Sequence, residues 1–337
     1  MRVVAAPDKF RGTATAAEVA AAVGRAARAA GWRCDEIPVA DGGDGLLDVL
    51  GGPNRTSVVT GPLGDPVEAG WRYERGTAVI EMARASGLLL AGGPEGNDPI
   101  AADTHGTGEL IQTAVEAGAT RVIVGLGGSA TTDGGLGALR ALYPHQRLRA
   151  VELLVACDVR TRFLDAAAVF GPQKGASRAQ VRLLTNRLAR LADVYLEDHG
   201  VDVRDLPGAG AAGGLAGGLA AIGAQLLDGF ALVADELELD QAVEGADLVV
   251  TGEGFLDDAS FEGKVVGGVA ELAADLGVPV VAVVGEEVDL DSVHAAVREC
   301  GIAEVVSLVE RFGRERAMSD TVGCVERVVA DVLAARS

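Results

Sequence analysis

The sequence predicts an α/β protein with two lobes, one a Rossmann-like open parallel sheet and the other an inserted second α/β domain. Short β-branched runs recur along the 337 residues, and Ala/Leu-rich stretches with helical spacing lie between many of them. Near-continuous apolar strands that alternate with helices are typical of buried parallel sheets. Most clusters of glycine and polar residues follow a predicted strand, which is where open α/β sheets form their ligand sites.

The apolar patterns give individual elements. Strands are predicted at residues 2–6, 37–40, 55–60, 77–80, 121–125, 151–156, 246–250, 278–284 and 303–308. Helices are predicted at residues 15–30, 108–117, 179–196, 267–276 and 319–335. The first helix opens with Thr15 and Glu18 at the spacing of a capping box, which marks a helix N-terminus.

The domain boundaries are predicted from turn residues. The segment 61–66, Gly-Pro-Leu-Gly-Asp-Pro, is the densest turn cluster, and we expect the chain to leave one lobe there. The first and last parts of the chain are then expected to share one sheet. This gives an outer Rossmann-like domain of residues 1–60 and 240–337, with an inserted α/β domain of residues 61–239.

The formal net charge of −20 bears on possible partners. Such a field repels polyanions, so neither nucleic acid nor an anionic membrane is an expected partner. A small anionic substrate remains compatible with this charge, because screening over about 8–10 Å lets a local cationic patch act independently.

Cysteine spacing and the N-terminus indicate the compartment. The four cysteines form no C-x-x-C pair, which fits a reducing environment. The chain runs from Met1 directly into a strand-like segment, and no apolar run reaches the roughly 18 residues that a membrane span needs. We expect a cytoplasmic protein, with monomer and homodimer both open.

Two loops near the N-terminus are candidate ligand sites. Asp8, Lys9 and Arg11 follow the first strand and could contact phosphates, although Asp8 as a turn cap with solvated cations is nearly as good an explanation. Asp41 and Asp44 lie in Asp-Gly-Gly-Asp-Gly and offer the hard oxygen ligands that magnesium prefers. Asp44 as a simple helix cap explains the pattern equally well.

Two glycine-rich segments are candidate anion sites. Residues 126–135 interleave four glycines with three hydroxyls and a carboxylate, which exposes many backbone N–H groups to an anion. The residues 208–213 match G-x-G-x-x-G, but the preceding polar segment with its proline is no strand, so a dinucleotide fold is rejected. A glycine-rich helix entry with a close backbone approach to a ligand or another helix is expected instead. The binding candidates here are Gly127, Gly128, Ser129, Asp133, Gly208, Gly210, Gly213 and Gly214.

Further along the chain, charged residues follow two more predicted strands. Asp158 is a candidate general base or metal ligand, or a buried carboxylate satisfied by helix N–H groups. Lys174 lies in the Gly-Pro-Gln-Lys-Gly segment that follows. Glu253 could bind metal or water and Lys264 a phosphate, while a solvated hairpin of charges is the plain alternative. The four histidines have no metal-binding spacing, and we assign none to a metal.

Taken together, these clusters resemble the type I glycerate kinase family from Pro7 to about Gly285. The matching blocks are Ala-Pro-Asp at 6–8, Val-Ala-Asp-Gly-Gly at 39–43, Gly-Thr-Gly-Glu-Leu-Ile at 106–111, Gly-Gly-Ser-Ala-Thr at 127–131, Asp-Gly-Gly at 133–135, Ala-Cys-Asp-Val at 156–159, Val-Phe-Gly-Pro-Gln-Lys-Gly-Ala at 169–176, Leu-Pro-Gly-Ala-Gly-Ala-Ala-Gly-Gly at 206–214 and Thr-Gly-Glu-Gly at 251–254.

The resemblance implies a kinase that uses ATP and a divalent cation, Mg²⁺, to phosphorylate D-glycerate, usually at the 2-hydroxyl in bacterial members, in a cleft between two lobes. Phosphoryl transfer needs positioning, charge neutralisation and a base. We expect Asp158 or Asp41 to be the base, with the remaining carboxylates among Asp41, Asp44 and Glu253 holding magnesium. The expected neutralising cations are Lys9, Arg11, Lys174 and Lys264.

Departures from the family pattern leave alternatives. Phe255 stands where the family usually has arginine in Gly-Glu-Gly-Arg, so a bidentate anion contact is lost. The segment between Leu142 and Val151 is shorter than in typical members. A kinase for another small hydroxy acid, or a catalytically degenerate relative that binds nucleotide or acid, therefore stays open, and a nicotinamide oxidoreductase ranks third.

Overall fold

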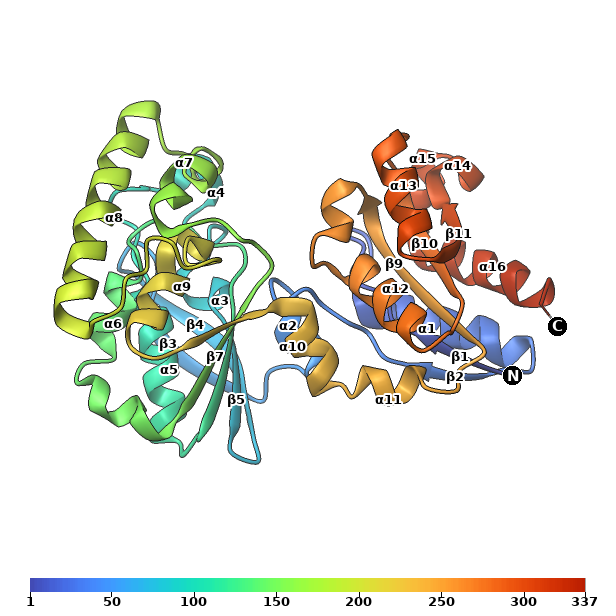
Figure 1. Ribbon diagram of the computed structural model, residues 1–337, viewed down its shortest axis with the longest axis horizontal. Helices are drawn as coiled ribbons and strands as arrows, with labels where there is room; N and C mark the ends of the chain where they lie inside the picture. Colours follow the sequence, from blue (N-terminus) through green and yellow to red (C-terminus); the bar gives the residue numbers. More distant parts are fainter. Residues whose placement is uncertain (337) are drawn as a thin grey trace. The chain divides into compact units, whose positions relative to one another are not determined.

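The computed structural model describes residues 1–336, and the chain divides into two compact units. Unit 1 consists of Met1–Asp41 and the chain from Phe230 onward, and unit 2 consists of Gly42–Gly229 (Figure 1). Each unit is a mixed α/β structure with its own sheet, which confirms the predicted fold class. No helix within residues 1–336 combines the length and the apolar character needed to span a bilayer.

Unit 1 contains a five-stranded parallel sheet in the order β11–β10–β9–β1–β2. Its strands are β1 (Arg2–Ala5), β2 (Arg33–Glu36), β9 (Leu248–Leu256), β10 (Val280–Glu287) and β11 (Ile302–Ser307). Residues 3–5, 248–250 and 280–284 of the central strands are buried and apolar, as both faces of a parallel sheet require.

Helices cover the sheet of unit 1, and α1 and α16 pack against each other (Figure 1). Apolar side chains of these two helices and of the central strands form one core. The capping box predicted for α1 is present, because Thr15 Oγ1 accepts from Glu18 N at 3.2 Å and Glu18 Oε2 accepts from Thr15 N at 2.8 Å. The helices are α1 (Ala16–Ala29), α10 (Gly229–Glu236), α11 (Leu239–Val243), η4 (Asp258–Phe261), α12 (Val265–Asp275), α13 (Asp291–Glu299), α14 (Leu308–Phe312), α15 (Arg314–Ser319) and α16 (Thr321–Ala334).

Unit 2 contains a six-stranded sheet in the order β3–β4–β5–β6–β7–β8. The first three strands are antiparallel neighbours, whereas β5 to β8 are parallel. The strands are β3 (Arg55–Thr60), β4 (Pro66–Glu74), β5 (Thr77–Glu81), β6 (Arg121–Gly125), β7 (Glu152–Cys157) and β8 (Gln225–Asp228).

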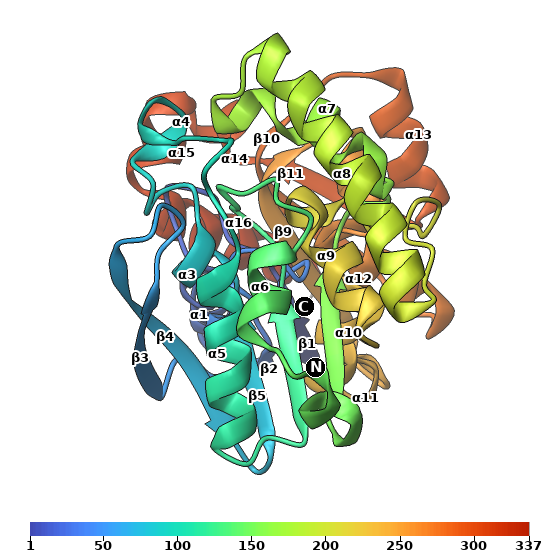
Figure 2. The same cartoon turned by 90° about the vertical axis from the view of Figure 1, so that its left-hand side faces the viewer.

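Helices α5 and α6 lie over one face of this sheet (Figure 2) and share its apolar core. The helices of unit 2 are α2 (Leu46–Val49), α3 (Ala83–Ser86), α4 (Gly93–Gly96), α5 (His105–Glu116), α6 (Leu136–Ala141), η1 (His145–Ala150), η2 (Phe163–Asp165), α7 (Ala166–Phe170), η3 (Pro172–Lys174), α8 (Arg178–His199) and α9 (Ala211–Ala221). All five predicted helices are present as α1, α5, α8, α12 and α16.

The prediction of strands was wrong at three places. The strand expected at residues 37–40 lies earlier, at β2, whose charged and partly exposed residues suit an edge position but hide the apolar signal. Strand β4 was missed because it begins at a proline and alternates buried with exposed residues instead of forming an apolar run. Strand β8 was missed because only four residues pair, and none of them is fully buried.

The turn cluster at 61–66 joins β3 to β4 in an antiparallel hairpin, closed by a bond from Gly61 N to Asp65 O at 2.6 Å. Strand β3 therefore belongs to unit 2, although the turn chemistry suggested a passage between lobes at this point. The structure divides the chain after Asp41 and after Gly229, whereas the predicted divisions were after residues 60 and 239.

Candidate functional site

The loop after β1 places Asp8 at the carboxyl end of the unit 1 sheet. Its main-chain N–H donates to Gly252 O at 2.8 Å, which ties the loop to β9. Lys9 N donates to Asp8 Oδ1 at 2.7 Å. Burial raises the pKa of Asp8 to about 6, the negative charge of Asp41 adds to this, and Lys9 and Arg11 oppose it. The structure thus brings these four predicted site residues together.

Glu253 lies in the same electrostatic cluster. Its Oε1 atom is buried and has no hydrogen-bond partner. Burial raises the pKa of this carboxyl to about 7, and the charges of Asp8 and Asp257 add to the rise. A hydrogen bond from Ser260 and the charge of Lys264 act in the opposite direction. Unit 1 therefore holds a carboxyl that is protonated over part of the physiological range.

Glycines let the loops of this cluster approach one another. A Cβ on Gly252 would lie 1.9 Å from Val283 O, so no other residue fits between β9 and β10. A Cβ on Gly254 would lie 3.2 Å from Arg11 N, close against the loop after β1. The Thr-Gly-Glu-Gly pattern thus sets Glu253 between a backbone contact that only glycine permits, at Gly252, and a tight one, at Gly254.

The donor set of unit 1 fits a hard divalent cation in type. Carboxylate oxygens are the ligands that magnesium prefers, and the orphaned Oε1 of Glu253 needs a partner. Within residues 1–336, however, no group of three or more His, Cys, Asp or Glu side chains is arranged to hold a metal ion. Magnesium usually keeps waters and substrate phosphates among its ligands, so one or two protein carboxylates are enough.

In unit 2, the loop that carries Asp44 packs against the loop after β6. A Cβ on Gly127 would lie 2.8 Å from Asp44 N, so this position requires glycine. Glu81, at the end of β5, is buried and accepts from Gly45 N at 2.9 Å and Leu47 N at 3.0 Å. Sequence reasoning missed Glu81, although a carboxylate directly after a buried strand was the signal used elsewhere.

Asp133 holds the starts of two helices. Its Oδ2 accepts from Thr104 N at 3.1 Å, Thr104 Oγ1 at 2.8 Å and Gly137 N at 2.9 Å, and its Oδ1 accepts from Gly135 N at 3.1 Å. Burial raises the pKa of Asp133, and these hydrogen bonds oppose the rise. The side chain fixes the loop that precedes α6 against the start of α5.

Lys174 is buried beneath the same loop. Its side chain is 2% exposed, and Nζ donates to Thr131 O at 2.7 Å. Burial lowers the pKa of Lys174 to about 7, while the charge of Asp133 opposes this. Asn97 Nδ2 donates to Ala130 O at 3.0 Å. Lys174 and Asn97 together thus form a support beneath the glycine-rich loop.

Three polar atoms around this support are buried without a hydrogen-bond partner: Asn97 Oδ1, Thr131 Oγ1 and Thr132 Oγ1. Buried polar groups in native proteins are nearly always paired, so such a cluster favours a ligand or ordered water at this place.

The two glycine-rich segments of unit 2 pack on each other. Gly134 N donates to Gly213 O at 3.0 Å. A Cβ on Gly213 would lie 2.0 Å from Thr131 O, and Gly213 has a φ of +68°. No strand precedes Gly208, since residues 201–207 form none, and α9 starts with left-handed residues. The close backbone approach is present, but its partner is the first glycine loop and not the ligand or helix that was expected.

Asp158 follows β7 at the carboxyl end of the unit 2 sheet. Burial and the charges of Asp158 and Asp228 raise the pKa of Cys157 to about 12, which places both carboxylates close to this thiol. Cys157 and Asp228 are register partners in β7 and β8. Asp228 was missed because the short strand before it was missed.

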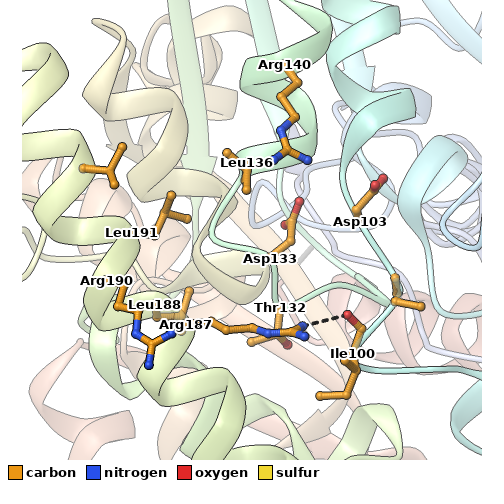
Figure 3. A pocket seen from close by; sticks show the side chains of 13 residues that line it. Ile100, Asp103, Thr132, Asp133, Leu136, Arg140, Arg187, Leu188, Arg190 and Leu191 are labelled. Carbon is orange, nitrogen blue, oxygen red and sulfur yellow. Dashed lines mark hydrogen bonds between the residues drawn. The ribbon is translucent and has the colours of Figure 1, made fainter.

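A pocket opens beside the loop 126–135, between α6, α8 and the segment before α5 (Figure 3). Its volume is about 410 Å³. Asp133 was predicted as a binding residue, and Thr132 lies in the same candidate anion site. The arginines and leucines come from helices, where no sequence pattern marked them as site residues. The pocket is lined by Ile100, Ala101, Ala102, Asp103, Thr132, Asp133, Leu136, Arg140, Arg187, Leu188, Arg190, Leu191 and Val194.

Comparison with known proteins gives one consistent family. The family model described as "Glycerate kinase family" matches residues 3–145 and 143–337. The two matches overlap at residues 143–145, inside the segment that was expected to be shorter than in typical members.

Relatives and a solved structure agree with that match. Glycerate 2-kinase from Escherichia coli (strain K12) is 38% identical over 93% of this chain and 92% of its own length. Glycerate kinase from Halalkalibacterium halodurans is 40% identical over 92% and 91%, respectively. The crystal structure of a putative glycerate kinase 2 from Salmonella typhimurium LT2 covers 100% of this chain and 99% of its own, with a TM-score of 0.82 and 34% identity.

Proposed function

The chain belongs to the glycerate kinase family, and on that premise we propose that it transfers a phosphoryl group from ATP to D-glycerate, at the 2-hydroxyl, to give phosphoglycerate and ADP. Relatives that are 38–40% identical over nine-tenths of the chain bear the names glycerate kinase and glycerate 2-kinase, which supports the acceptor. We place this activity in the cytoplasm.

The observation that carries the proposal is the Oε1 atom of Glu253 in unit 1, which is buried without a hydrogen-bond partner. A buried carboxyl whose pKa is about 7 and whose Oε1 has no partner is poised to exchange a proton for a divalent cation. We propose that Glu253 holds Mg²⁺, and that Asp41 is a second ligand if Asp158 is the base. The cation would neutralise phosphate charge as it develops.

Cations of unit 1 are proposed to bind anionic groups of the ligands. Lys9 and Arg11 act electrostatically on Asp8, and Lys264 acts on Glu253. Each combines a positive charge with a position beside the carboxyl cluster, so a triphosphate or a carboxylate is attracted even though the protein is strongly acidic. Asp8 orients this loop through its bond from Lys9 N.

Asp158 and Asp41 remain the candidates for the base that accepts the hydroxyl proton. Asp158 follows the parallel strand β7 and lies near Asp228, and the charge of Asp41 acts on Asp8. Gly127, Gly128 and Ser129 are proposed to offer backbone N–H groups to a ligand. Lys174 is proposed to assist from below through its bond to Thr131 O.

The activity is tested by measuring ADP release from ATP with D-glycerate in the presence of MgCl₂, followed by phosphorus and carbon NMR of the product. We expect turnover that depends on the acid and a product phosphorylated at carbon 2. ADP release that does not depend on D-glycerate would exclude this acceptor, and a 3-phosphate would change the position but not the family.

Phe255 supports a second candidate, a kinase of the same family for another small hydroxy acid. Its side chain is 48% exposed at the end of β9, two residues after Glu253. A panel of hydroxy acids tested with wild type and Phe255→Arg separates the two functions. If D-glycerate is the substrate, the variant keeps or raises kcat/KM for it, and no other acid surpasses it in the wild type.

A further inference from the structure

The pocket of unit 2 is formed by three elements that are distant in sequence. Helix α8 supplies one wall with Leu188, Leu191 and Val194, and α6 supplies Leu136. The segment before α5 closes the other side, where Arg187 Nη1 donates to Ile100 O at 3.0 Å. Figure 3 shows this bond passing beside Thr132, so the arginine bridges the pocket from α8 to the opposite segment.

The pocket lining has an apolar part and a polar, charged part. Four aliphatic side chains from α6 and α8 form an apolar surface, while Arg140 and Arg187 are solvent-exposed cations at its edge. Asp103 and Asp133 add oxygen acceptors, which Figure 3 shows on either side of the space below Arg140. A ligand that matches this lining has an apolar body, hydroxyl groups and an anionic end.

Thr132 gives a second indication of a ligand, which does not depend on the chemistry of the lining. It lines the pocket, is only 2% exposed, and its Oγ1 has no hydrogen-bond partner. Leaving a buried hydroxyl unsatisfied costs free energy that a ligand atom placed there would recover. The hydroxyl also belongs to the glycine-rich loop 126–135, so part of that loop forms a wall of the pocket.

The volume of the pocket favours ATP over D-glycerate as its ligand. A volume of about 410 Å³ falls in the range of sites that hold ligands of drug size. A three-carbon hydroxy acid would leave most of this volume empty and has no apolar body for the four aliphatic side chains. A purine nucleotide has a flat apolar base, a ribose with hydroxyls and an anionic phosphate end.

We infer that this pocket is the nucleotide subsite, with the base against Leu188, Leu191 and Val194 and the phosphates toward Arg140 and Arg187. The inference rests on the proposed function for the identity of ATP as the donor. Thr132 Oγ1 hydrogen-bonds the nucleotide, and Asp103 accepts from ribose. The glycine loop 126–135 is then the nucleotide loop, and the segment 208–214 supports it from behind.

Two matched tryptophan variants on α8 test this assignment. Val194 lines the pocket and is 43% exposed, whereas Leu196 is 44% exposed and does not line it. Val194→Trp fills the space where the base binds. By isothermal titration calorimetry we expect its Kd for ADP with MgCl₂ to rise at least about tenfold, the size of one well-packed contact. Leu196→Trp should keep the wild-type Kd.

The acceptor provides the second readout. The KM for D-glycerate should be the same in Val194→Trp as in the wild type when ATP is saturating. An unchanged Kd for ADP in Val194→Trp, or a raised KM for the acid alone, overturns the inference while leaving the kinase activity in place. Conversely, ADP binding that Val194→Trp weakens in a protein that does not phosphorylate D-glycerate keeps the inference and rejects the proposed acceptor.

Photolabelling gives an answer that does not depend on any variant. With 8-azido-ADP and MgCl₂, the label should appear in the segments 100–103, 132–140 or 187–194, and excess ADP should suppress it. Labelling confined to peptides of unit 1, or no binding of ADP by the wild type, overturns the assignment.

Discussion

The Nζ atom of Lys174 donates a hydrogen bond to the main-chain oxygen of Thr131 at 2.7 Å beneath the glycine-rich loop of unit 2. Because burial lowers the pKa of this amine to about 7, the loop rests on a group whose charge changes in the physiological range. The same loop holds Thr132, and hence one side of the proposed nucleotide pocket, in place.

The first prediction concerns Lys174→Met and stability. In the unfolded chain the amine keeps its proton up to its usual pKa of 10.5, whereas in the folded protein it loses the proton near pH 7. Between these values the unfolded state binds more protons, so the free energy of unfolding of the wild type rises with pH relative to the variant. The slope is at most about 1.4 kcal/mol per pH unit.

Urea denaturation of both proteins at pH 5.5, 6, 7.5 and 9 measures this difference. It should be constant between pH 5.5 and 6, where both states are protonated, and should then grow in favour of the wild type. A difference that stays constant up to pH 9 would show that Lys174 remains charged in the folded protein.

The second prediction concerns Glu253→Gln. Burial raises the pKa of Glu253 from 4.5 to about 7, so the folded state holds a proton that the unfolded state releases. The wild type therefore loses stability relative to the variant as pH rises from about 4.5 to 7. Thermal unfolding should give the variant a Tm above that of the wild type at pH 8 and closer to it at pH 5. The reverse order at pH 8 would mean that the carboxylate is stabilised, not destabilised, by its surroundings.

The third prediction concerns magnesium. A cation that binds the ionised Glu253 stabilises the folded state by mass action, and protons compete with it. Millimolar MgCl₂ should raise the Tm of the wild type more at pH 8 than at pH 5.5. The Tm of Glu253→Gln should respond much less at either pH. Equal Tm shifts in both proteins would mean that the metal does not bind Glu253.

The fourth prediction tests Asp158 as the base. Asp158→Asn should lower kcat by about 10²–10⁴ while the Kd for ATP is kept, since a general base acts on the acceptor hydroxyl and not on nucleotide binding. Asp165→Asn, an exposed carboxylate seven positions further along the chain, serves as the control and should leave kcat unchanged. An unaltered turnover number in Asp158→Asn would assign the base to Asp41.

The fifth prediction separates close packing from backbone strain. Gly213→Ala places a Cβ 2.0 Å from Thr131 O at a positive φ, whereas Gly223 has a φ of +104° and nothing within 4 Å. Gly223→Ala should cost about 1–2 kcal/mol from strain alone. Gly213→Ala should cost clearly more in the free energy of unfolding, and should also raise the Kd for ADP. Equal losses in the two variants would mean that the loops separate without cost.

Sequence patterns predicted those strands and helices that have an apolar run with clear turn or capping residues at its ends. Strands β3 and β6 match their predicted ranges because apolar or β-branched runs end at clear turn residues. The Thr15 capping box located the start of α1. The fold class follows from such alternation, but the edge strands β2 and β8, which are short and have no fully buried residue, lack the apolar signal.

The candidate site was predictable only where its residues follow a strand. Asp8 and Glu253 were found in this way, and the structure brings their charges together. Arg140 and Arg187 could not be found, because they lie within helices and line the same pocket only after α6 and α8 pack. Likewise, G-x-G-x-x-G at 208–213 specifies a close approach but not its partner, since Gly213 and Thr131 are distant in sequence.

The position of β1 has a consequence for synthesis on the ribosome. This strand lies between β2 and β9, and Thr251 Oγ1 reaches Ala6 O across 245 positions of sequence. Strand β1 is translated first, but it can pair with β9 only after the chain has been made past unit 2. Every strand of unit 2 has been translated by Asp228. The inserted unit can acquire its native sheet first, and the N-terminal segment stays without its β9 neighbour until Leu256 has been translated.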